Sequence, residues 1–161
     1  MTRQEVEQYA FARISSGMNC AESVLHTAMN QCGLPTDGTP TRIASCFGGG
    51  VGRSKDELCG ALAGGLMALG LCFGRDVPSA SCELAYDLAA EFRERFIELH
   101  GSSKCRDLRE CFGEQIEWAA CKKLVADTTG LLHEILEEQR SPDEPATNSP
   151  ASPLPSTASN P

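Results

Sequence analysis

Cysteine is the residue type in this sequence that is best suited to do chemistry. Nine of the 161 residues are cysteines, at positions 20, 32, 46, 59, 72, 82, 105, 111 and 121. The N-terminal segment has no apolar core of the signal-peptide type, so we expect a cytoplasmic chain whose thiols are kept reduced. In that compartment a cysteine-rich sequence more often indicates metal binding or redox chemistry than a disulfide scaffold.

The spacing of the cysteines argues against several familiar sites. No two of them are arranged as Cys-x-x-Cys, which is the spacing of a thioredoxin-like dithiol, a zinc finger or covalent c-type haem. An iron–sulfur cluster needs four converging thiolates, but these need not be close together in the sequence. A helical bundle can supply one thiolate from each of several helices.

Two of the cysteines lie near expected helix starts. Cys20 follows the candidate N-cap Asn19, and Cys105 follows the polar stretch 102–104. Unpaired N–H groups and the positive end of the helix dipole favour a thiolate at such positions. Cys121 lies beside the inward stripe of the last expected helix, where it could face the other thiols.

The stretch GGGVGRSKDELCGALAGG, residues 48–65, raises the question of a phosphate-binding loop. A P-loop needs Gly-x-x-x-x-Gly-Lys-Ser/Thr, but here the residues after the glycines read Arg-Ser-Lys. The dinucleotide fingerprint also fails, so we expect no nucleotide cofactor. The glycines at 60 and 64 instead predict close approach of another backbone. Such packing could serve the core alone, or it could bring other thiols beside Cys59.

Four cysteines and the glycine-rich loop together resemble a known family. The segment Cys59–Gly64 matches the CGAxxG signature of the redox-active proteins named for the cysteine pattern C_GCAxxG_C_C, and the loop FGGGVGR precedes it. The other signature cysteines correspond to Cys20, Cys105 and Cys121. The resemblance runs from about Asn19 to Glu138, and it implies a helical domain with four redox-active or metal-binding thiols.

Three functions are consistent with these residues. The first is an electron-transfer protein that holds an iron–sulfur cluster through four converging cysteines, which are Cys20, Cys59, Cys105 and Cys121. The second is thiol–disulfide or peroxide chemistry by a pair of these four thiols without metal. The third is structural zinc, or no site at all. The first two imply a redox partner protein.

The other five cysteines are assigned by their surroundings. Cys32 and Cys72 lie in apolar helical patterns, and we expect them to act as small hydrophobic core residues. The sequence assigns no role to Cys46, Cys82 or Cys111. Because Cys46 precedes the glycine loop and Cys111 follows Cys105 closely, either could replace or supplement a signature thiol.

Histidines and large aromatic residues give fewer indications. His100, which precedes the segment GSSKC, is a candidate ligand or proton donor. His26 and His133 lie in helical patterns and are expected at the surface or at the boundary of the core. Trp118 and Tyr86 are expected in the core.

The elements that must hold these thiols are predicted to be helices. Capping boxes at Thr2–Glu5, Asn19–Glu22 and Ser54–Glu57 open the first three. A fourth helix ends before Gly101, and the last runs from about residue 114 to 139. Apolar residues recur with the helical period along these segments, and no period-two pattern predicts a strand.

From these elements we expect an all-α fold, a compact bundle of about five main helices. The bundle is expected to occupy residues 1–140. The segment 141–161 is rich in Pro, Ser, Ala and Thr and has almost no apolar side chains to bury. It is therefore predicted to be a disordered tail.

Charge and hydropathy limit the partners. The net charge is −8, which gives no electrostatic attraction for nucleic acid or an anionic membrane. The longest apolar run, residues 58–73, is shorter than the ~20 residues of a membrane-spanning helix. A homodimer is possible, and the sequence does not set the oligomeric state.

Overall fold

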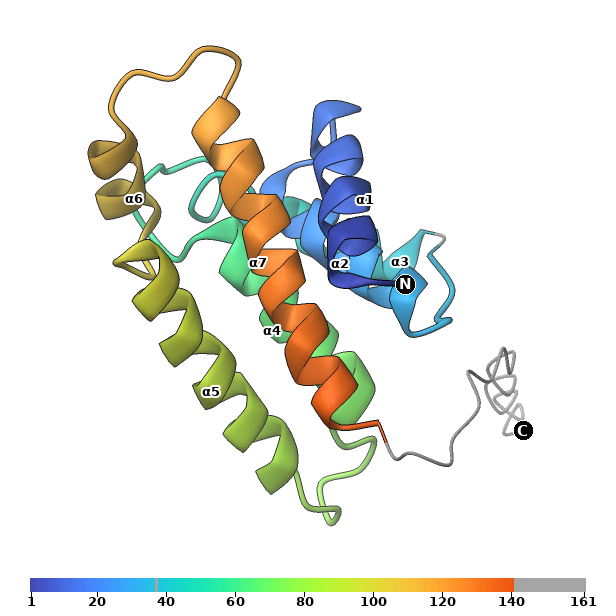
Figure 1. The fold of residues 1–161 in the computed structure, drawn as a ribbon. Helices are drawn as coiled ribbons and strands as arrows, with labels where there is room; N and C mark the ends of the chain where they lie inside the picture. The colour runs from blue at the N-terminus through green and yellow to red at the C-terminus, as the bar shows by residue number, and fades with distance from the viewer. Residues whose placement is uncertain (37, 141–161) are drawn as a thin grey trace, which may run out of the picture.

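The computed structural model describes residues 1–36 and 38–140, which form a helical bundle (Figure 1). The helices in this part of the chain are α1 (Arg3–Ser15), α2 (Cys20–Gln31), α3 (Thr39–Ala44), the 3-10 helix η1 (Ser45–Phe47), α4 (Gly60–Phe73), α5 (Glu83–His100), α6 (Cys105–Phe112) and α7 (Ala119–Glu138). These residues contain no strand, which confirms the all-α class. There are seven α-helices rather than five. The short helix α3 was not predicted, and the short helix α6, whose start was expected at Cys105, was not counted among the main helices. The predicted tail, residues 141–161, lies outside the described residues.

Two of the three predicted capping boxes start helices. The Thr2 side chain accepts a hydrogen bond from the Glu5 N–H group, and the Glu5 side chain accepts one from the Thr2 N–H group. Asn19 and Glu22 form the same pair of hydrogen bonds at the start of α2. Both boxes satisfy N–H groups that would otherwise lack partners in the first helical turn. Local sequence alone therefore fixes the position of Cys20 at the beginning of α2.

The third box was predicted wrongly. The Ser54 hydroxyl accepts hydrogen bonds from the N–H groups of Asp56 and Glu57, at 3.2 and 3.4 Å, but it caps a turn and not a helix. The chain then becomes extended, and Leu58 forms an isolated antiparallel bridge with Lys104. As a result, α4 begins only at Gly60.

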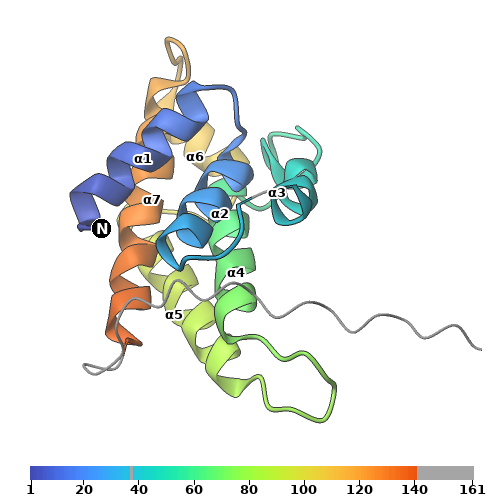
Figure 2. The same ribbon diagram turned by 90° about the vertical axis from the view of Figure 1, so that its right-hand side faces the viewer.

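Helices α2 and α4 lie side by side and run in the same direction (Figure 2). A Cβ atom added at Gly64 would lie 2.3 Å from the carbonyl oxygen of Ala21. Further along, the sulfur atoms of Cys32 and Cys72 lie 3.5 Å apart. The close approach predicted from the glycines of α4 is therefore confirmed.

Helix α7 completes the core between α1 and α5 (Figure 1) and also packs against α2 and α4. Its residues Leu132 and Ile135 are fully buried, as are Phe92 and Phe96 of α5. None of the described helices combines the length and apolarity needed to span a membrane.

Several side chains lie elsewhere than predicted. Trp118 and Tyr86 are 51% and 64% exposed, whereas His26 and His133 are buried. The last helix starts at Ala119 and not near residue 114, because Glu117 and Trp118 have left-handed backbone angles that a helix does not allow. Trp118 consequently precedes the helix instead of lying on its buried face.

Candidate functional site

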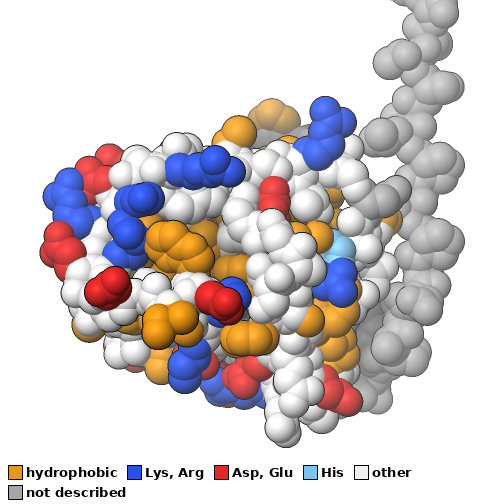
Figure 3. Space-filling view, turned by 90° about the horizontal axis from the view of Figure 1, so that it is seen from above, with side chains coloured by type: hydrophobic (Ala, Val, Ile, Leu, Met, Phe, Trp, Pro, Cys, Tyr) orange, Lys and Arg blue, Asp and Glu red, His pale blue; other side chains and the backbone are white. Residues whose placement is uncertain are grey.

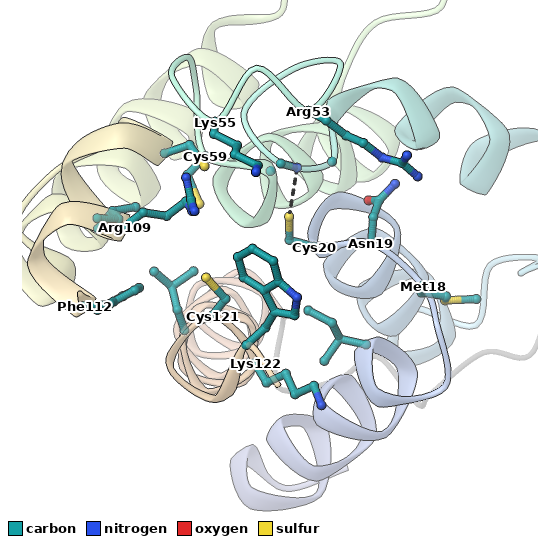
Figure 4. Close-up of a pocket in the computed structure, with 18 of the residues that line it drawn as sticks. Met18, Asn19, Cys20, Arg53, Lys55, Cys59, Arg109, Phe112, Cys121 and Lys122 are labelled. Carbon is teal, nitrogen blue, oxygen red and sulfur yellow. Dashed lines mark hydrogen bonds between the residues drawn. The ribbon is translucent and has the colours of Figure 1, made fainter. Parts of the chain in front are cut away.

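A cavity of about 680 Å³ lies at one end of the bundle, where the first turns of α2, α4, α6 and α7 meet (Figure 4). Cys20 is the first residue of α2, and Cys59 is the N-cap of α4. Cys105 is the first residue of α6, and Cys121 lies in the first turn of α7. All four line this cavity. The fold thus brings the four predicted site residues together from four different helices.

The glycine-rich loop lies directly against two of these cysteines. The N–H group of Gly49 donates a hydrogen bond to the Cys20 sulfur at 3.5 Å (Figure 4). A Cβ atom at Gly50, whose φ is +75°, would lie 2.7 Å from the Cβ of Cys105. On α4, a Cβ atom at Gly60 would lie 2.7 Å from the Cys20 sulfur. These glycines leave room for the two thiols.

Backbone pairing holds the cysteines of α4 and α6 near each other. The Cys59 N–H group donates to the carbonyl oxygen of Ser103 at 2.8 Å. The Cys105 N–H group donates to the carbonyl oxygen of Glu57 at 2.7 Å. These two bonds flank the bridge between Leu58 and Lys104, so the short extended segment that replaces the predicted helix start positions both thiols.

Gln115 holds the fourth cysteine. Its side-chain oxygen accepts a hydrogen bond from the Cys121 N–H group at 2.9 Å, and its side-chain nitrogen donates to the Cys121 sulfur at 3.3 Å. Gln115 therefore donates a hydrogen bond to the Cys121 sulfur, as Gly49 of the glycine-rich loop does to the Cys20 sulfur. Sequence reasoning missed this residue, because a single glutamine in a connecting loop has no distinguishing pattern.

The cavity wall is positively charged although the chain is acidic. Its charged residues are all basic: Arg53, Lys55, Arg109 and Lys122. Asp and Glu side chains are absent from the lining, in a chain whose net charge is −8. Figure 3 views the molecule from above and shows hydrophobic side chains surrounded by both basic and acidic ones. The basic lining of the cavity favours negatively charged contents.

The buried thiols resist ionisation. Burial raises the pKa of Cys59 to about 12, and the nearby Cys20 adds to this effect. Burial also raises the pKa of Cys105 and of Cys121, while Arg109 acts in the opposite direction on both. The N–H groups of the first turn of α4 do lower the pKa of Cys59, as predicted for a helix start, but burial outweighs them. Without a cation these three sites favour the neutral thiol at neutral pH.

The four thiols surround the cavity and do not meet at one point. In residues 1–36 and 38–140, no group of three or more His, Cys, Asp or Glu side chains lies close enough to hold a single metal ion. His100, a candidate ligand, lies elsewhere: its ring packs 4.7 Å from that of Phe96, and its Nε2 atom is 3.4 Å from the Thr128 hydroxyl.

The other five cysteines do not line the cavity. Cys46 and Cys111 are exposed, and Cys82 is the N-cap of α5. Cys32 and Cys72 pack against the core as predicted, but they also contact each other at the far end of α2 and α4.

Comparison with known protein families finds a match over most of the chain. Residues 18–135 match the model of a family described as "Putative redox-active protein (C_GCAxxG_C_C)". No curated protein and no solved structure matches the chain. The matched segment contains all four cavity cysteines and the glycine loop that packs against them. The chain therefore belongs to the C_GCAxxG_C_C family.

Proposed function

We propose that this protein is an electron-transfer protein that binds an iron–sulfur cluster through Cys20, Cys59, Cys105 and Cys121. One observation carries the proposal: four thiols from four helices line a single cavity whose charged residues are all basic. Thiolates are the usual ligands of such clusters, and the bound group would supply one-electron transfer.

The ligand set and the cavity both fit a group of several atoms. The cavity measures about 680 Å³ and carries thiols on several sides. A cluster with four thiolate ligands carries net negative charge. The cationic wall offsets that charge, through Arg53, Lys55, Arg109 and Lys122.

The residues around the thiols have defined roles in this proposal. The Gly49 N–H group and the Gln115 side chain donate hydrogen bonds to the sulfurs of Cys20 and Cys121. Hydrogen bonds to ligand sulfurs stabilise negative charge and so raise a reduction potential. Phe112 and Trp118 line the cavity and offer apolar surface to a bound group. A partner protein would donate or accept the electron.

A second candidate function is thiol–disulfide chemistry without metal. The backbone bridge between Leu58 and Lys104 favours it, because it holds Cys59 and Cys105 in neighbouring segments. A disulfide between them would further need their Cα atoms within about 7 Å. The raised pKa of both thiols argues against it, since the thiolate is the attacking form.

Metal analysis and visible spectroscopy test the proposal. Protein purified anaerobically, or reconstituted with ferrous iron and sulfide, should be coloured and contain both elements. Serine substitution of each cavity cysteine in turn should abolish the visible absorption. Cys46→Ser, which changes an exposed cysteine outside the cavity, should leave it unchanged.

Two outcomes would contradict the cluster. Colourless protein that reversibly loses two cavity thiols on mild oxidation would support the dithiol function. Colourless protein that contains zinc would support a structural metal site.

A further inference from the structure

A second pair of thiols lies outside the cavity. The sulfur atoms of Cys32 and Cys72 are 3.5 Å apart, and both side chains are half-buried. Cys32 is the C-cap of α2, and Cys72 lies in the last turn of α4. Helix α2 has 12 residues, so about 18 Å separates this pair from the cavity at the other end of the helix. The pair therefore forms a separate site.

The hydrogen bond between the two thiols makes them unequal. The Cys72 thiol donates to the Cys32 sulfur, which lowers the pKa of Cys32 and raises that of Cys72. Arg140 lowers the pKa of both thiols, and Glu137 raises that of Cys32. The Arg140 side chain is held in place by a hydrogen bond to the carbonyl oxygen of Gln31 at 3.3 Å and an ion pair with Glu137 at 2.9 Å. Cys32 is thus suited to be the attacking thiolate.

We infer that Cys32 and Cys72 form a second redox site, a dithiol that reduces low-molecular-weight disulfides such as glutathione disulfide. The proximity of the two sulfurs carries this inference. A disulfide bond is about 2.0 Å long, so the sulfurs need to approach by only about 1.5 Å. The inference does not depend on a cluster in the cavity.

The reaction has two exchange steps. The Cys32 thiolate attacks one sulfur of the small disulfide, so that a mixed disulfide forms and one small thiolate leaves and takes up a proton. Cys72 then loses its proton to solvent and attacks the Cys32 sulfur, which releases the second small thiol. In total, two protein thiols are oxidised to one disulfide, and one small disulfide is reduced to two thiols.

Disulfide mapping on the full-length wild-type chain tests this reaction. Fully reduced protein is treated anaerobically with glutathione disulfide, the remaining thiols are alkylated, and the protein is digested with trypsin and then with a glutamate-specific protease. Residues 23–42 then form a peptide that contains only Cys32, while Cys20 falls in residues 14–22. We expect the peptide of residues 23–42 to be disulfide-linked to the peptide of residues 58–75. Because the second peptide contains both Cys59 and Cys72, fragmentation in the mass spectrometer should place the bond at Cys72.

Variants and a second readout separate this site from the cavity. Cys32→Ser and Cys72→Ser should each abolish the cross-link, whereas Cys46→Ser should retain it. Cys32→Ser should also keep the iron content of the wild type. The dithiol inference and the proposed cluster can therefore be contradicted independently. The inference is wrong if the exposed Cys46 becomes glutathionylated while Cys32 and Cys72 are both alkylated. A linkage between Cys20 and Cys59 alone would equally contradict it.

Discussion

The substitution Gly64→Ala tests whether the packing of α2 against α4 sets the positions of the cavity thiols. A Cβ atom at residue 64 would lie 2.3 Å from the carbonyl oxygen of Ala21 and 3.1 Å from its Cα. These are backbone atoms, which cannot rotate away as the end of a side chain can. Cys20 precedes Ala21 in α2, and Cys59 caps α4, so a shift between the helices moves these thiols apart.

Gly70→Ala in the same helix is the matched control. A Cβ atom there would have no neighbour within 4 Å. At either position alanine gains up to about 1 kcal/mol of helix propensity over glycine, so this gain largely cancels in the comparison. What remains at Gly64 is overpacking, which typically costs about 1–3 kcal/mol. We expect Gly64→Ala to melt roughly 3–12 °C below Gly70→Ala in a domain of this size.

Denaturant unfolding followed by circular dichroism measures the difference directly. Thermal unfolding of the same samples gives the melting temperatures, and iron content after reconstitution reports on the cavity. Iron should fall in Gly64→Ala and stay unchanged in Gly70→Ala. If the two variants are equally stable, the contact with Ala21 does not constrain the helices, and our account of how Cys20 is positioned is wrong.

Two further predictions concern Gln115 and the three histidines. Gln115→Leu removes the hydrogen bond to the Cys121 sulfur and should therefore lower the reduction potential of the proposed cluster in a spectroscopic redox titration. An unchanged potential would contradict this role of Gln115. Burial lowers the pKa of His26, His100 and His133. The unfolded chain therefore binds more protons than the folded chain just below about pH 6.5, and the free energy of unfolding should fall as the pH is lowered through that value. His100→Asn should reduce this slope in denaturant unfolding at several pH values; an unchanged slope would exclude His100 as a source.

Local sequence predicted those features whose interactions are local. The boxes at Thr2 and Asn19 start helices because both partners lie within one turn. The same pattern at Ser54 failed, because pairing of Leu58 with the distant Lys104 keeps the chain extended. No local rule distinguishes these cases. The exposure of Trp118 was missed for a related reason. The sequence pattern places Trp118 inside the last helix, but its left-handed backbone keeps it outside α7.

The candidate site was predictable in part. The family signature identified four cysteines, and the fold places them around one cavity. Gln115 was not predictable, because its contact with Cys121 depends on the path of the connection between α6 and α7. The raised pKa of Cys59 was not predictable either, because it results from burial by several distant elements. A helix start favours a thiolate only where solvent still reaches it.

The contact between Cys32 and Cys72 follows from the same packing that forms the cavity. Helices α2 and α4 run in the same direction, with Gly60 beside Cys20 at one end of the pair. Both helices rise by the same distance per residue. Two residues that lie the same number of positions after this contact, one in each helix, are therefore again side by side. Cys32 follows Cys20 by as many residues as Cys72 follows Gly60. Equal spacing is thus a signal that sequence analysis could have used, once parallel packing was known. Both thiol sites depend on one helix register, which the contact at Gly64 holds in place.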